Sequence, residues 1–106
     1  MLEIIETPVF TKLVQELLPP EQYRLLQWAL VARPDQGTLV PHASGLRKLR
    51  WVIPGQGKRG GLRVLYFWDK PNRQIYMLYL YSKRDQADLT PTQAKALGRL
   101  IREELK

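Results

Sequence analysis

Residues 62–82, LRVLYFWDKPNRQIYMLYLYS, decide the fold of this chain. Two runs rich in aromatic and apolar residues, 62–68 and 74–82, lie on either side of a short segment, 69–73, that contains Asp, Pro and Asn. Runs of this kind predict strands, and a short polar segment with these residue types predicts a tight turn between them. The sequence therefore predicts an antiparallel hairpin.

Side chains alternate between the two faces of a strand, so the hairpin also predicts which residues lie together. In the first strand, Arg63 is expected on the face opposite Val64. In the second strand, three residues are expected to share a face: Met77, Tyr79 and Tyr81.

A third strand is predicted over residues 46–53, upstream of the hairpin. Leu49 and Trp51 fall on one of its faces, and Lys48 and Arg50 fall on the other. The glycine-rich, basic segment 54–61 is expected to form the turn that joins this strand to the hairpin. The three strands then make an antiparallel meander, while residues 2–6 predict a further, N-terminal strand.

Helices are predicted on both sides of the meander in the sequence. Thr7-Pro8 is typical of a helix start, and apolar residues then recur at spacings of three and four up to residue 18. A second helix is expected to close before Pro34, and residues 34–45, which include His42, are expected to form a loop. A capping box at residues 90–93, Thr-Pro-Thr-Gln, predicts the start of a C-terminal helix.

These elements predict a single domain over residues 1–106 of the α+β class. Their order is an N-terminal strand, a two-helix hairpin, a three-stranded antiparallel meander and a C-terminal helix. The helices are expected to cover one face of the sheet and to leave the other face open.

Composition excludes several kinds of chemistry. The 106 residues include no cysteine and one histidine, so disulfides, a thiolate nucleophile, a cysteine zinc site and a Ser-His-Asp triad are not expected. We accordingly predict no metal and no cofactor. The first residues carry acids where a secretory signal carries bases, and no apolar run approaches the length of a membrane span. The expected location is the cytoplasm, without membrane contact.

The positive charge is concentrated in one segment. Residues 46–84 contain ten bases and one acid, a net charge of +9, whereas the other 67 residues carry a net charge of −2. The same segment holds all but one of the tyrosines and two of the three tryptophans. Clustered bases among aromatic residues are typical of a surface that binds a polyanion, and a solvated basic face is the alternative.

On an open sheet face, cations from three strands could converge, because neighbouring strands lie about 5 Å apart. Such a face suits RNA: arginine forks bind phosphate, aromatic rings stack on bases, and the 2′-hydroxyl is an available nucleophile. Metal-free cleavage then needs a group that accepts the 2′ proton, cations that stabilise the phosphate, and a group that protonates the 5′-oxygen. Lys83 or Lys48 is a candidate base, because neighbouring cations disfavour the charged form of a lysine.

Several blocks of the sequence resemble one family. The blocks are GLRKLR at 45–50, GKRGGLRVLY at 57–66, IYMLYLYSK at 75–83 and DLT at 88–90. Together, and in this order over nearly the whole chain, they resemble the RelE/ParE superfamily of toxins from type II toxin-antitoxin systems, in particular the HigB-like branch. The resemblance implies a RelE-like fold and a ribosome-dependent endoribonuclease, an mRNA interferase that cuts mRNA in the ribosomal A site, inhibits translation and arrests growth.

The resemblance also implies roles for individual residues. Arg63 matches an arginine that contacts the scissile phosphate, Lys83 matches a basic residue after the last strand, and Tyr81 lies near a position where some relatives use a tyrosine in proton transfer. The expected catalytic residues are therefore Arg63, Lys83, Tyr81 and Lys48, and the expected RNA-binding residues are Arg47, Arg50, Lys58, Arg59 and Arg84. Arg84 and Trp51 depart from the residue types expected at their positions.

The family further implies partners. These are a cognate antitoxin, usually a helix-turn-helix protein of the HigA-like type, the ribosome with its mRNA, and operator DNA only through the antitoxin, while the toxin itself is expected to be monomeric. Two other functions stay open at this point. One is a ParE-like toxin that inhibits DNA gyrase without cutting nucleic acid, and the other is a non-catalytic basic module that binds nucleic acid.

Overall fold

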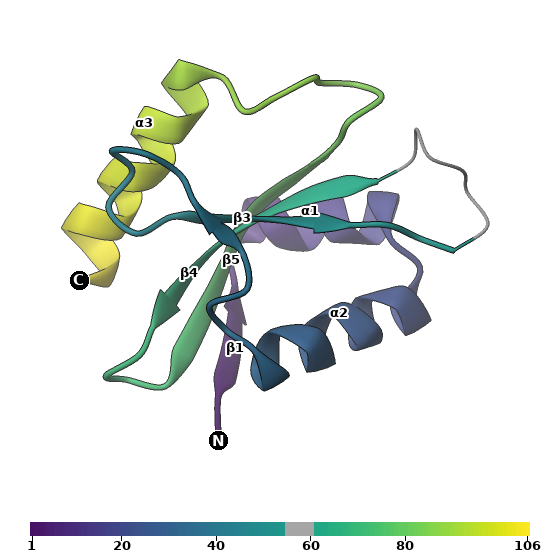
Figure 1. The fold of residues 1–106 in the computed structure, drawn as a ribbon, viewed down its shortest axis with the longest axis horizontal. Helices are drawn as coiled ribbons and strands as arrows, with labels where there is room; N and C mark the ends of the chain where they lie inside the picture. The colour runs from purple at the N-terminus through teal and green to yellow at the C-terminus, as the bar shows by residue number, and fades with distance from the viewer. Residues whose placement is uncertain (55–60) are drawn as a thin grey trace.

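The computed structural model describes residues 1–54 and 61–106 and has an α+β fold. Its sheet has five strands in the described part of the chain, in the order β1-β5-β4-β3-β2 (Figure 1). The strands are β1 (Glu3–Glu6), β2 (Thr38–Leu39), β3 (Arg47–Trp51), β4 (Leu62–Asp69) and β5 (Gln74–Ser82). The predicted meander of β3, β4 and β5 is confirmed as antiparallel, and β1 pairs with β5 in parallel.

The short strand β2 was not expected, because residues 34–45 were predicted to be a loop. Thr38 pairs with Lys48, so β2 adds a fifth strand at the edge of β3. Two side chains hold the preceding segment: Arg47 Nη1 donates to the carbonyls of Asp35 and Gly37, and the Tyr66 hydroxyl donates to the carbonyl of Pro34 at 2.7 Å. A strand of two residues has no detectable period, so only its pairing with β3 defines it.

Helices α1 (Pro8–Leu17) and α2 (Pro20–Ala32) cover one face of the sheet (Figure 1). The Thr7 side chain accepts a hydrogen bond from the backbone N–H of Phe10, so the predicted helix start is confirmed. The two helices and the sheet enclose a core whose buried members are Phe10, Val14, Leu18, Leu26, Leu30, Leu62, Val64, Tyr66, Ile75, Met77 and Leu80.

Helix α3 (Pro91–Leu100) lies on the opposite face of the sheet and continues into one π-helical segment, η1 (Ile101–Leu105) (Figure 1). Its predicted capping box at Thr90 and Gln93 is confirmed. The helix packs against the loop before β3, where a Cβ added at Gly98 would lie only 2.9 Å from Ala43 Cα. The expectation that all helices cover one face is therefore wrong. Helical periodicity defines an apolar stripe but does not say which face of a sheet the stripe meets.

An irregularity in the β4–β5 pairing corrects a second expectation. Leu65 pairs with Tyr79, but the next residue, Tyr66, pairs with Met77, so β5 has one extra residue at this point. Met77 consequently belongs to the core under α1 and α2, whereas Tyr79 and Tyr81 face α3. The three residues do not share a face as predicted. Among the helices of the described residues, none has the length and apolar character needed to cross a membrane.

Candidate functional site

Cations and phenols line up in rows across the sheet, on the face that also carries α3. Arg50 of β3 pairs directly with Arg63 of β4, and Arg63 pairs directly with Tyr81 of β5. In the next row on the same face, Lys48 pairs with Leu65, and Leu65 pairs with Tyr79. The strand registers therefore bring together cations that the sequence had placed on separate strands.

The Arg50–Arg63 pair is unfavourable for folding, because like charges directly opposite one another in a sheet repel. Arg63 is half-buried, and its Nη1 atom is shielded from solvent without a hydrogen-bond partner among the described residues. The Tyr81 hydroxyl, in the same row, is also buried and lacks such a partner. Buried polar atoms without partners cost free energy, so this row has hydrogen-bonding capacity that the described residues do not use.

Burial determines the protonation of Tyr81. Removal from water raises the pKa of its phenol, and the negative charge of Asp88 raises it further, while the charge of Arg63 acts in the opposite direction. The phenol is therefore neutral at neutral pH. It can donate a hydrogen bond or a proton, and it is a poor base.

Lys48 has an acidic neighbour. Its Nζ atom lies 3.1 Å from Asp88 Oδ1, in an ion pair between β3 and the loop before α3. Its hydrogen bond with Lys48 is the main cause that lowers the pKa of Asp88, and the backbone N–H of Leu89 contributes as well. The expected environment of Lys48, crowded by cations alone, is therefore wrong in this respect.

Lys83 lies at the end of the same row of strands. Its backbone N–H donates to the carbonyl of Gly61 at 3.1 Å, which continues the β4–β5 pairing beyond Ser82. The side chain is exposed, and its charge also lowers the pKa of Asp88. Lys83 thus belongs to one group of cations, which we call the cationic face: Lys48, Arg50, Arg63 and Lys83.

Other residues expected to bind RNA do not join the cationic face. Arg47 alternates with Lys48 along β3, so it lies on the opposite face, where its guanidinium binds two loop carbonyls. Arg84 lines a hollow beside α1 together with Glu16 and Ile53. Lys58 and Arg59 lie outside the described residues. His42 is exposed and adopts a positive φ of 58° in the loop before β3.

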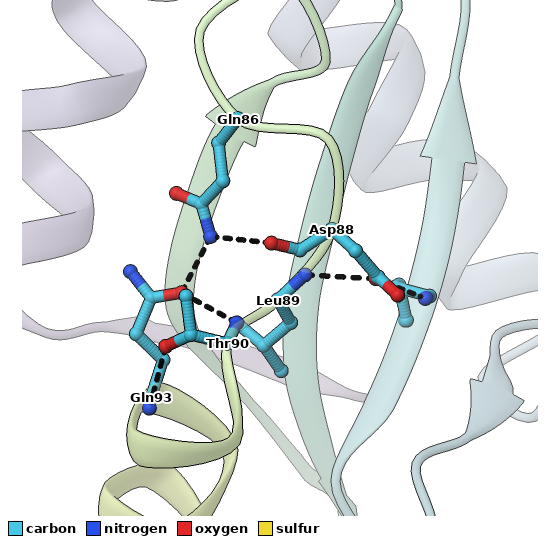
Figure 2. Close-up of polar contacts among 6 residues, drawn as sticks. Gln86, Asp88, Leu89, Thr90 and Gln93 are labelled. Atoms are coloured by element: carbon cyan, nitrogen blue, oxygen red, sulfur yellow. Dashed lines mark hydrogen bonds and ion pairs between the residues drawn. The ribbon is translucent and has the colours of Figure 1, made fainter.

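Sequence analysis missed the acidic side of the site. Asp88 was noticed only as part of the DLT block, and Gln86 and Gln93 were not considered beyond the helix cap. Figure 2 shows how these side chains connect the loop to the start of α3. The contact between Lys48 and Asp88 spans forty positions of sequence, so no local pattern could have predicted it.

The site residues are suited to bind a polyanion rather than a metal ion. Guanidinium and ammonium groups bind phosphate oxygens, and a neutral buried phenol adds a hydrogen-bond donor among them. Within residues 1–54 and 61–106, no group of three or more His, Asp or Glu side chains is placed to hold a metal ion.

A comparison of the chain with protein-family models finds no family model that matches. The similarity to RelE/ParE toxins thus rests on the sequence blocks alone.

Proposed function

We propose that the protein is the toxin of a type II toxin-antitoxin system and that it cuts mRNA on the ribosome. One observation carries the proposal: Arg50 and Arg63 face each other directly across the sheet, with a buried phenol completing the row. This arrangement disfavours folding, and an RNA phosphate bound there would neutralise the repulsion and accept hydrogen bonds from the unpartnered donors.

The proposed roles follow from position and charge. Arg63 binds the scissile phosphate, because its guanidinium lies in the middle of the row, and Arg50 binds the same or the neighbouring phosphate. Lys48 and Lys83 lie further out on the cationic face and supply additional positive charge. Cations fixed on strands are already oriented before RNA binds, which is the arrangement that stabilises a developing charge most effectively.

The proposed reaction is a transesterification within the RNA. The 2′-oxygen forms a bond to the adjacent phosphorus and gives its proton to a base, and the bond from phosphorus to the 5′-oxygen breaks as that oxygen receives a proton. The products are a 2′,3′-cyclic phosphate and a 5′-hydroxyl. Tyr81 suits the protonation step, because its pKa is raised and its phenol stays neutral. A lysine of the cationic face, Lys83 or Lys48, is the proposed base.

The proposal includes a cytoplasmic location and the partners implied by the family resemblance. The ribosome with its mRNA is the target, a HigA-like antitoxin neutralises the toxin, and operator DNA is reached through the antitoxin. Co-purification of the chain with the product of a neighbouring reading frame, and loss of toxicity when both are expressed, tests this part.

Primer extension on mRNA from cells that express the chain tests the activity. We expect new 5′ ends inside translated codons, their loss with Arg63→Ala, and their retention with Arg24→Ala. Arg24 is exposed on α2, away from the cationic face, so this control removes one arginine without touching the proposed site.

Other results of the same experiment support the alternatives. Growth arrest with intact mRNA and altered DNA topology would favour a ParE-like gyrase inhibitor. Normal growth together with RNA binding in vitro would favour a basic module without catalytic activity.

A further inference from the structure

A carboxylate lies within reach of the cationic face. Asp88 Oδ1 contacts Lys48 Nζ, and the charge of Lys83 acts on the same carboxylate. The segment that supplies the four cations, residues 46–84, contains a single acid, Asp69. Asp88 therefore brings a negative charge to the site from outside the basic segment.

The loop, rather than Lys48, sets the position of this carboxylate. The Gln86 amide Nε2 donates to the backbone carbonyl of Asp88 at 2.8 Å and also to Gln93 Oε1 in the first turn of α3 (Figure 2). The backbone N–H of Leu89 donates to Asp88 Oδ1 at 2.8 Å. Gln93 in turn donates to the Tyr79 hydroxyl at 3.3 Å, which connects the loop to β5. These bonds orient Asp88 independently of the lysine.

The ion pair itself is exposed. The side chains of Lys48 and Asp88 retain 33% and 72% of their accessible surface. Pairs exposed to this degree are weak and are screened by salt, so another anion can displace the carboxylate at little cost.

We propose that Asp88 is an internal competitor for the anion that the cationic face binds, and that it determines specificity. Its carboxylate occupies the Lys48 ammonium in the free protein, and an RNA phosphate must displace it to reach that ammonium. A strand held by Arg50 and Arg63 at the same time brings a phosphate to this position, whereas an anion that reaches Lys48 alone gains little over the carboxylate. The inference rests on the proposed function of the face.

Binding of a single-stranded oligouridylate, measured over a range of salt concentrations, tests the inference. For Asp88→Asn, we expect roughly threefold to fivefold tighter binding at low salt, the size of effect that an exposed ion pair produces. The slope of log affinity against log salt should also steepen by about 0.7, because one more cation is free to contact phosphate. Asparagine retains an oxygen that can accept from Leu89, and thermal unfolding checks that the variant is folded.

Two controls isolate the role of Asp88. Asp85→Asn removes the same charge from an exposed position of the same loop and should leave the slope unchanged. In a Lys48→Gln background, Asp88→Asn should no longer steepen the slope, because the ammonium that it exposes is absent.

The outcomes separate this inference from the proposed function. If wild type binds, Arg63→Ala does not, and Asp88→Asn behaves like Asp85→Asn or binds more weakly than wild type, the inference is wrong and the RNA site stands. If wild type and Arg63→Ala bind equally weakly at the lowest salt, both the inference and the proposed site are overturned.

Discussion

The two faces of the central sheet use the same strands in opposite ways. On the face under α1 and α2, the inward residues of β4 and β5 are fully buried, and the Tyr66 hydroxyl finds two backbone partners in the segment after α2. On the face that carries α3, apolar packing extends over part of the strands, and the rest holds an arginine pair and a phenol without partners in the described residues. The comparison teaches that one face supplies stability, so that the other can hold charges that disfavour folding.

The largest expected effect comes from the α1/α2 face and concerns two adjacent leucines of α2. Leu26 is 0% exposed and Leu25 is 48% exposed. Leu26→Ala should lower the free energy of unfolding by about 2–5 kcal/mol, because it leaves a cavity in the core. Leu25→Ala should change it by no more than about 0.5 kcal/mol. Urea unfolding measures both, and equal losses would show that α2 does not pack as described.

A matched pair of tyrosines contrasts the two faces directly. Tyr66→Phe removes the partner of the Gly37 N–H and should cost about 1–3 kcal/mol, because the donor is left buried and unsatisfied. Tyr81→Phe should cost little or nothing in stability, because its hydroxyl is unpartnered among the residues that the structure describes. Under the proposed mechanism, Tyr81→Phe should instead reduce mRNA cleavage. A stability loss in Tyr81→Phe as large as in Tyr66→Phe would contradict the contrast.

Alkaline pH should weaken the fold through tyrosines on both faces. Burial raises the pKa of Tyr23, Tyr66 and Tyr81, and the hydrogen bond from Tyr23 to Glu6 adds to the effect at that residue. Unfolded tyrosines ionise near pH 10, so the unfolded state loses protons that the folded state keeps. The stabilisation is fully present below about pH 10 and is lost as the pH rises toward the folded pKa values.

Urea unfolding between pH 8 and pH 11 measures this decline. Tyr23→Phe should decline less steeply than wild type, since one of the shifted groups is gone. A free energy of unfolding that stays constant across this range would contradict the burial of the three phenols.

The sequence predicted the fold where a signal was local. The hairpin of β4 and β5 follows from alternating apolar residues around a turn, and both helix starts at Thr7 and Thr90 follow from capping residues. The strand β2 and the extra residue in β5 could not be predicted in this way. Each is defined by pairing with a neighbouring strand, which adds little to the local pattern.

The candidate site was predicted in the same measure. Period-two alternation placed Lys48 and Arg50 on one face, and the structure adds the register that sets Arg50 opposite Arg63. Alternation also puts Arg47 on the other face of β3, although charge alone had grouped it with the RNA-binding residues. Asp88 reaches Lys48 through the loop and α3 cap, a contact that depends on tertiary structure.

The most direct test of the account is the free energy of unfolding of Arg63→Met, measured beside its cleavage of mRNA in a translating extract. Methionine keeps much of the apolar stem of the side chain and removes the charge that faces Arg50. We expect a protein as stable as wild type, or more stable by about 0.2–1 kcal/mol, that no longer cuts mRNA. A variant that is less stable by more than about 2 kcal/mol, the range of a disrupted core, would show that Arg63 holds the fold together.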